Sequence, residues 1–293
     1  MTSVRKPRKG SRRVDIFGKS PVVSAAELIV LAFVVVFALL PLYQMIIDAL
    51  RPVDEFGVGG SLLPPFTPTL ENLQRAWSEL GFDRMMLNSG LLAVTSALLA
   101  TAFGAMAGFA LSHLHVRWRG LVLAGLLVNM AVPPIVILVP VFVTASDLGI
   151  VNTVMVGIVG ELGLLTAFSS VLIYAYMVDL PKELFEASAV DGARPARQFW
   201  HVAIPNAVPS LVSAFVLSLV FAWNDLLIPL ILWPTSRLQT LMTGLAFLGP
   251  GRTGLQDVPL LMAGVLISAL PLVLVYLATR RHLRSGMFRG RMP

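Results

Sequence analysis

The sequence predicts an all-α membrane protein with six transmembrane helices, and three observations support this. The 293 residues are 56% hydrophobic and only 13% charged, with a mean hydropathy of +0.81. Soluble domains usually have about 25% charged residues. The apolar residues also form blocks of about 20 or more, which is the length needed to cross a bilayer core. The net charge of +6 therefore reports on membrane topology, and we expect no nucleic-acid partner.

The hydropathy pattern predicts one transmembrane domain over residues 25–280, between a basic leader (1–24) and a basic tail (281–293). The uncharged stretch from Leu28 to Ile47 is too long for the apolar core of a signal peptide, so we interpret it as an uncleaved first span. The six spans are expected near residues 25–47, 87–112, 120–145, 151–177, 206–233 and 258–279.

The distribution of Lys and Arg predicts that both termini are cytoplasmic. With the N-terminus placed inside, 17 of the 22 basic residues fall on the inner side of these spans and five fall on the outer side. Cytoplasmic loops carry such an excess of basic residues in multi-pass proteins. The loop between the fourth and fifth spans is therefore expected to face the cytoplasm.

Turn and helix signals organise the remaining segments. The first outer loop, 49–86, is rich in Gly and Pro and ends in TLENLQRAW (69–77), which predicts a short helix capped by Thr69. The last outer loop, 234–257, is again rich in Gly and Pro. Because proline removes a backbone donor, we expect kinks or breaks at the prolines inside apolar runs. These are Pro133, Pro134, Pro140, Pro229 and Pro271.

No residue pattern for catalysis appears in the chain. The sequence has no cysteine and four histidines, and it contains no HExxH, GxSxG or GxxxxGK[ST] motif. We therefore expect no catalytic residue, no metal site and no cofactor, and we expect that this chain does not bind ATP itself. We interpret His113 and His115 as an interfacial pair at a helix end and not as metal ligands.

Two acidic residues fall within predicted spans. Glu161 lies roughly 15 Å into the fourth span at 1.5 Å per residue, and Asp225 lies in the fifth. An ionised group at the bilayer centre costs at least about 2.5–3.5 kcal/mol, so such residues usually face a cavity or a partner. The polar and aromatic candidates for a solute pathway are Asn129, Glu161, Tyr174, Trp223, Asn224 and Asp225, with Ser169 and Ser170 as further donors. Helix-to-helix hydrogen bonding is the competing interpretation for each of them.

The stretch KELFEASAVDGARPARQFWHVAIP, residues 182–205, is unusually polar and patterned for this chain. Asp179 and Pro181 predict the start of a helix, Asp191 and Gly192 a tight turn, and Pro195 a second helix. Aromatic residues on such an element are costly to leave in water, so they require a partner surface. The pattern favours a stiff docking element over an ordinary connecting loop.

This stretch resembles the EAA loop of ABC importer permeases, with residues 179–205 forming the loop. The motif positions fall on Glu186, Ala187, Ser188, Gly192, Val202, Ile204 and Pro205. Ser188 replaces an alanine, Val202 replaces an isoleucine and Ile204 replaces a leucine of the pattern. The resemblance implies that these positions, with Asp191 and Phe199, couple the chain to an ATPase. It further implies that Glu186 braces the docking element and that Gly192 allows close backbone approach.

Other segments are similar to carbohydrate permeases of the maltose-transport type. They are TLENLQRAW (69–77), LNSGLLAV (87–94), LGIVNT (148–153) and AWNDLLIPLIL (222–232), whereas the basic C-terminal tail departs from the pattern. The resemblance implies one membrane subunit of a type I, binding-protein-dependent importer for a sugar or sugar derivative in a bacterial-type plasma membrane. Its implied partners are a second homologous permease, two ATP-binding cassette subunits, an extracytoplasmic solute-binding protein and the lipid bilayer.

Two alternatives remain open at the level of sequence. The transported solute could be a peptide, an amino acid or phosphate instead of a sugar. The chain could also be a stand-alone secondary transporter that uses Glu161 or Asp225 as a proton carrier.

Overall fold

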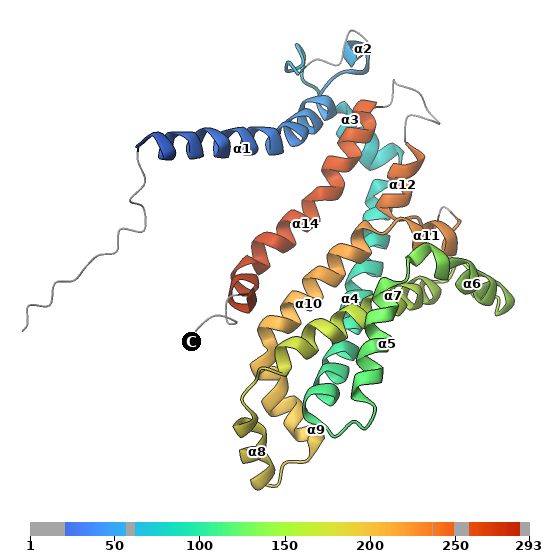
Figure 1. Ribbon diagram of the computed structural model, residues 1–293. Coiled ribbons are helices and arrows are strands. Elements are labelled where there is room, and N and C mark those ends of the chain that lie inside the picture. Colours follow the sequence, from blue (N-terminus) through green and yellow to red (C-terminus); the bar gives the residue numbers. More distant parts are fainter. Residues whose placement is uncertain (1–20, 57–61, 236, 249–257, 288–293) are drawn as a thin grey trace, which may run out of the picture. The chain divides into compact units, whose positions relative to one another are not determined.

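A computed structural model describes residues 21–56, 62–235, 237–248 and 258–287 of the chain (Figure 1). All regular elements within these ranges are helical. Five helices are long and apolar enough to cross a membrane, and one bent helix pair could form a sixth span. The all-helical class is thus confirmed, and the described residues contain five candidate spans, or six if the bent pair is counted as one. The basic leader, up to residue 20, and the end of the tail, from residue 288, lie outside the described residues.

The first helix, α1 (Pro21–Ala49), belongs mainly to a compact unit of its own that ends at Gln44. Its apolar side chains from Leu28 to Leu40 are exposed to a large extent, including Phe33 and Phe37. The uncharged part of this helix, residues 28–47, is suited to a hydrocarbon environment, because a helix satisfies its backbone polar groups internally. This agrees with the first predicted span.

The second unit begins at Met45. It starts with three short elements, α2 (Val53–Phe56), α3 (Glu71–Gln74) and a π-helical turn, η1 (Arg75–Glu79). The predicted helix near Thr69 starts one residue later than a Thr69 cap requires, because Leu70 is the N-cap residue. The Thr69 hydroxyl still accepts a hydrogen bond from the Glu71 amide at 3.1 Å. The buried Asn72 fixes this segment, since its amide donates to the carbonyls of Ala49 and Arg51 at 3.1 and 2.8 Å.

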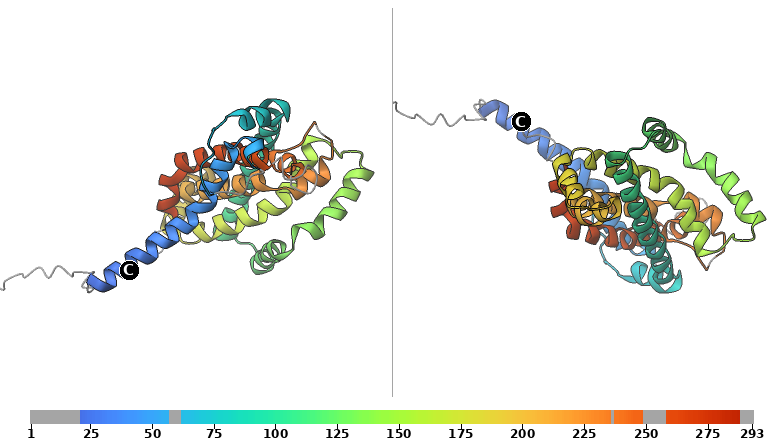
Figure 2. Two further views of the ribbon diagram at one scale, coloured as in Figure 1. Left: turned by 90° about the horizontal axis from the view of Figure 1, so that it is seen from above. Right: turned by 90° about the horizontal axis from the view of Figure 1, so that it is seen from below.

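Three long helices make the centre of this unit, namely α4 (Phe82–His113), α7 (Val154–Met177) and α10 (Ile204–Asn224). The views in Figures 1 and 2 agree that α4 runs beside α7 and α10, and that α10 runs beside α14 (Val258–Met287). Small residues allow the close approach: a Cβ atom on Gly104 would lie 2.7 Å from the Cβ atom of Ser169. Small residues at interfaces are the usual way for membrane helices to pack.

The third predicted span, 120–145, is not one straight helix. It consists of α5 (Arg119–Ala131) and α6 (Pro134–Asp147), which are bent by 95°. The cause is the Pro133–Pro134 pair, because a residue before proline is forced into extended backbone, and Val132 and Pro133 have ψ angles of 124° and 131°. The break expected at these prolines is confirmed, whereas α6 continues through Pro140.

The fifth predicted span, 206–233, has the wrong boundaries. The continuous helical run extends over α9 (Pro195–Gln198), a π-helical turn η2 (Phe199–Ala203) and α10. It ends at Asn224, and a separate short helix, α11 (Leu227–Leu232), follows. The wide turn carries the helix past Pro205, which has no amide to donate. Pro205 is therefore the second residue of α10 and does not precede the span.

The last predicted span begins at Val258 as expected, but its helix α14 runs through Pro271 and on to Met287. The segment 234–257 before it also contains a helix that the Gly and Pro content did not predict, α12 (Leu241–Phe247), capped by the Thr240 hydroxyl. Residues 249–257 of that loop lie outside the described residues.

Candidate functional site

The EAA-like loop, residues 179–205, is a helix, a glycine turn and a second helix, as predicted. Its first helix, α8, covers Lys182–Val190 with Pro181 as the N-cap residue, so the expected Asp179 cap is wrong. The helix ends at Val190 with Asp191 as its C-cap residue, and Gly192 follows with a φ of +79°. The Gly192 amide donates to the Ala189 carbonyl at 3.0 Å, and the Ala193 amide donates to the Ser188 carbonyl at 2.9 Å. This pair of bonds is the Schellman motif, which requires the left-handed backbone that glycine adopts without strain.

A side chain from the second helix fixes the first across this turn. The Gln198 amide nitrogen donates to the Phe185 carbonyl and to the Ser188 hydroxyl oxygen, each at 3.0 Å. The Ser188 hydroxyl in turn donates to the Phe185 carbonyl at 2.8 Å. Ser188, which stands where the EAA pattern has an alanine, therefore contributes a hydrogen bond that alanine cannot make.

Two of the three aromatic residues of the loop, Phe185 and Phe199, pack against other parts of this chain. Phe185 is only 7% exposed, and its ring centroid lies 3.7 Å from that of His113 at the end of α4. Phe109, one turn earlier on α4, contacts the rings of Phe185 and Phe199 with centroids 6.2 and 5.5 Å apart. Trp200 remains 64% exposed.

The opposite surface of α8 is free for a partner. Glu186, Ala187, Asp191 and Gly192 are all exposed, and Val190 is 88% exposed. Within the described part of the chain, Glu186 makes no hydrogen bond or ion pair, so it does not brace the loop from inside.

The remaining motif positions lie at the base of the loop. Val202 and Ile204 are partly buried and pack against the core that contains Phe109 and Phe185. Pro205 is exposed. The base of the loop is thereby anchored by apolar contacts, while α8 projects from it (Figure 1).

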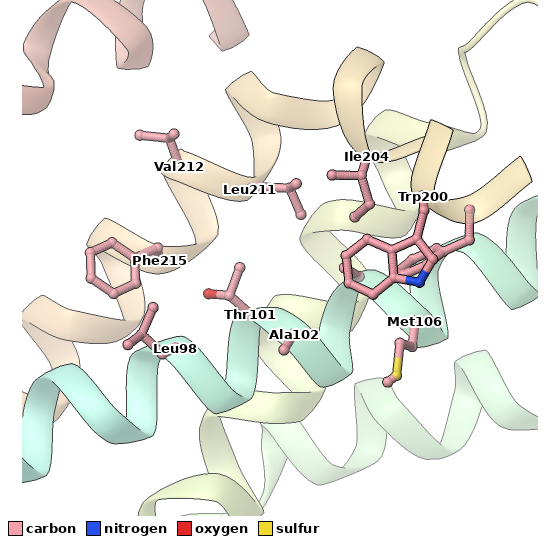
Figure 3. A pocket seen from close by; sticks show the side chains of 11 residues that line it. Leu98, Thr101, Ala102, Met106, Trp200, Ile204, Leu211, Val212 and Phe215 are labelled. Carbon is pink, nitrogen blue, oxygen red and sulfur yellow. The ribbon is translucent and has the colours of Figure 1, made fainter. Parts of the chain in front are cut away.

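An apolar hollow of about 380 Å³ lies between α4 and α10 next to this loop. Figure 3 shows Leu98 and Met106 of α4 facing Leu211 and Phe215 of α10 across it, with Trp200 at one end. None of the predicted pathway residues lines this hollow, and a nearly complete lack of hydrogen-bonding groups makes it unsuited to a sugar.

The structure brings two of the predicted pathway residues together. Glu161 on α7 is 2% exposed, and its carboxyl group lies close enough to that of Asp225 for the two to interact. Within the described residues, one carboxyl oxygen of Glu161, Oε1, is buried and has no hydrogen-bond partner. Asp225 occupies the break between α10 and α11, where one of its oxygens accepts hydrogen bonds from the amides of Leu227 and Ile228 at 2.7 and 3.5 Å.

The other predicted pathway residues do not join this pair. Trp223 is buried and donates from its indole nitrogen to the Ser268 carbonyl of α14 at 3.1 Å. Asn224 is exposed and donates to the Val220 carbonyl of its own helix. Tyr174 contacts Arg119 of α5, whose guanidinium donates to the phenol and lies 5.0 Å from the ring centroid.

Asn129 lies on α5 near the proline break, and its carbonyl oxygen is buried without a partner among the described residues. The two serines act in helix packing: the hydroxyl oxygens of Ser169 and Ser218 are 3.1 Å apart, and Ser170 donates to the Thr166 carbonyl.

The sequence did not predict a set of hydrogen bonds that holds the end of α11 against the start of α7. Asn152 adopts a φ of +62°, and its side-chain oxygen accepts hydrogen bonds from the amide and hydroxyl of Thr235 at 3.2 and 3.1 Å. The Trp233 indole donates to the Thr153 carbonyl at 2.7 Å, and a Cβ atom on Gly157 would lie 2.4 Å from the Trp233 ring. The LGIVNT segment contained the signal, because Asn is among the few residues that tolerate left-handed backbone.

Comparisons with known proteins agree with this arrangement. The family model described as "Binding-protein-dependent transport system inner membrane component" matches residues 100–289. The diacetylchitobiose uptake system permease protein NgcG of Streptomyces coelicolor is 24% identical over 87% of this chain and 84% of its own. The melibiose/raffinose/stachyose import permease protein MelC of Bacillus subtilis is 27% identical over 86% and 90%, respectively.

Among solved structures, a bacterial ABC transporter that imports the acidic polysaccharide alginate contains a chain of the same fold. Its TM-score is 0.73 at 19% identity, covering 89% of this chain and 96% of that one. The family model matches well over half of the residues, which establishes the family, and the solved structure shows the same fold. This chain belongs to the family of inner membrane components of binding-protein-dependent transport systems, and it is a multi-pass, non-catalytic transport subunit of a bacterial plasma membrane.

Proposed function

We propose that this chain forms half of the translocation pathway of an ABC importer for a sugar or sugar derivative. The relatives NgcG and MelC are named for the uptake of oligosaccharides, and the solved neighbour imports alginate. These relatives are matched over most of their length, so the likeness is not restricted to a shared segment. A second permease subunit, two ATPase subunits and a solute-binding protein complete the proposed importer, and both termini of this chain face the cytoplasm.

The EAA-like loop couples this chain to the ATPase. The observation that supports this most is the combination of a fixed base and a free surface. The Schellman turn at Gly192 and the Gln198 bonds hold α8 rigidly, whereas Glu186, Ala187 and Val190 remain exposed. A rigid helix with an unpartnered face can transmit a displacement that a flexible loop would absorb.

ATP must bind one state of the importer better than the other to drive this movement. A shift from 1:99 to 99:1 between inward- and outward-facing states requires about 5.5 kcal/mol of differential binding.

Glu161 and Asp225 are the best candidates for contact with the solute. The unpartnered Glu161 Oε1 is a buried hydrogen-bond acceptor, and sugars offer many hydroxyl donors. A site built to accept such donors discriminates strongly against solutes that lack them. Exposure of this pair during the cycle would supply specificity that the apolar hollow in Figure 3 cannot provide.

A single substitution tests the coupling role. Gly192→Asp places a charge on the proposed docking surface, and we expect normal membrane insertion but loss of ATP-driven uptake and of co-purification with the ATPase. Gly149→Asp is the matched control, because Gly149 also has positive φ (+66°) and open space around its Cβ position. Intact assembly and transport with Gly192→Asp would refute the coupling role.

Transport by the chain alone tests the broader proposal. In liposomes without ATPase or nucleotide, we expect no uptake in a pH gradient. Uptake under these conditions would favour the secondary-transporter alternative.

A further inference from the structure

The helix α8 is held to the rest of the protein at few points. Among its nine residues, only Phe185 is buried. The chain itself connects α8 to α7 on one side and to α9 and α10 on the other. The Gln198 side chain adds hydrogen bonds from α9 to Phe185 and Ser188 of α8. The Phe185 ring adds the contact with α4, because it packs against His113 and Phe109.

His113 is well placed to make this connection rigid. It is the last residue of α4, and its ring stacks on Phe109 at 5.8 Å with 15° between the planes. The Ser112 hydroxyl oxygen lies 2.7 Å from the Gly108 carbonyl oxygen and 2.6 Å from Nδ1 of His113, so Ser112 links the ring by a hydrogen bond to the last turn of α4. The ring is thereby oriented from two sides before it meets Phe185.

The position of α4 makes the contact relevant to transport. This helix packs along both α7 and α10, and a Cβ atom on Gly104 or Gly108 would lie within about 3.0 Å of α7, so the two helices are in close contact there. A displacement that reaches α4 therefore reaches the helices next to Glu161 and Asp225.

We propose that His113 is a positioning residue for energy coupling, which joins α8 to α4 so that both move as one body. The inference rests on the proposed function of the EAA-like loop and adds a specific route from it to the spans. The feature that this role requires is the packing of the His113 ring against Phe109 and Phe185, and the Ser112 contact is a secondary support.

The test uses the complete importer in liposomes with wild-type, His113→Ala, His113→Phe and His115→Ala permease. The measured quantity is solute imported per ATP hydrolysed. Ring pairs of this kind contribute enough that their loss should lower this ratio by about two- to tenfold in His113→Ala. His113→Phe should restore most of it, and His115→Ala should match wild type, because His115 is exposed and makes no ring contact within the described residues.

Two outcomes separate this inference from the proposed function. Failure of the wild-type complex to assemble or to couple ATP hydrolysis to uptake would refute the function itself. A normal ratio in an assembled His113→Ala complex would refute only the inference, and so would a loss that His113→Phe does not rescue.

A second experiment follows from the lack of native cysteine. In a His113→Cys, Phe185→Cys double variant, a short bifunctional thiol reagent should join α4 to α8 and raise the lowered coupling ratio. Inhibition of transport by the cross-link would overturn the inference, because it would show that the two helices must move apart.

Discussion

The left-handed backbone of Gly192 makes a quantitative prediction about coupling. Its φ is +79°, and a Cβ atom added there would meet nothing within 4 Å. The cost of Gly192→Ala should therefore come from the backbone alone, which is roughly 1–2 kcal/mol for a left-handed residue with a side chain. A cost of this size lowers the population of the Schellman turn by about 5- to 30-fold, if no other contact holds it.

The assay is ATP-driven uptake by the complete importer, together with the affinity of the permease for its ATPase. We expect activity to fall in the order Gly, Asn, Ala, Val at position 192, because Asn tolerates left-handed backbone better than Ala and β-branched residues tolerate it least. Gly149→Ala should have less effect on ATPase affinity despite its similar φ of +66°. Equal activity of the Ala and Gly proteins would show that this backbone conformation is not required.

Three further predictions concern packing, the loop and the outer segment. Gly104→Ala should destabilise the solubilised protein by about 1–3 kcal/mol, because its Cβ would lie 2.8 Å from the backbone of α7. Gly90→Ala on the same helix should not destabilise it, because the space around Gly90 is open. Equal thermal unfolding temperatures for the two variants would contradict this prediction. Gln198→Leu should increase hydrogen exchange in α8 and lower ATPase affinity by a few-fold, as expected for hydrogen bonds of about 1 kcal/mol; unchanged exchange would refute the bracing role. The pKa of Glu55 is held below its usual 4.5, mainly because the Thr67 hydroxyl donates a hydrogen bond to the carboxylate. This contact therefore stabilises the segment above pH 4.5, and the stabilisation is lost as the pH falls through the lowered pKa. Hydrogen exchange of the Thr67 amide should show this pH dependence, and Glu55→Gln should abolish it.

The sequence by itself determined the features that depend on local chemistry. Hydrophobic length predicted the long helices, the Pro133–Pro134 pair predicted the break between α5 and α6, and Gly192 predicted the left-handed turn. Each follows from steric or solvation properties of a short segment, so no tertiary contact is needed to infer it.

Features that depend on distant partners were decided only by the tertiary structure. The fifth span was expected to reach residue 233, but Asp225 caps α11 and Trp233 binds the start of α7, so the helix ends at Asn224. The sequence led to the interpretation of His113 as an interfacial residue. Its contact with Phe185 joins segments about 70 residues apart, and no local pattern reveals such a contact. Likewise, the hydrogen bond from the Trp223 indole to the Ser268 carbonyl joins residues far apart in the sequence, so no local pattern predicted it. Side-chain orientation depends on which helices pack together, and the periodicity of one helix does not specify its neighbours.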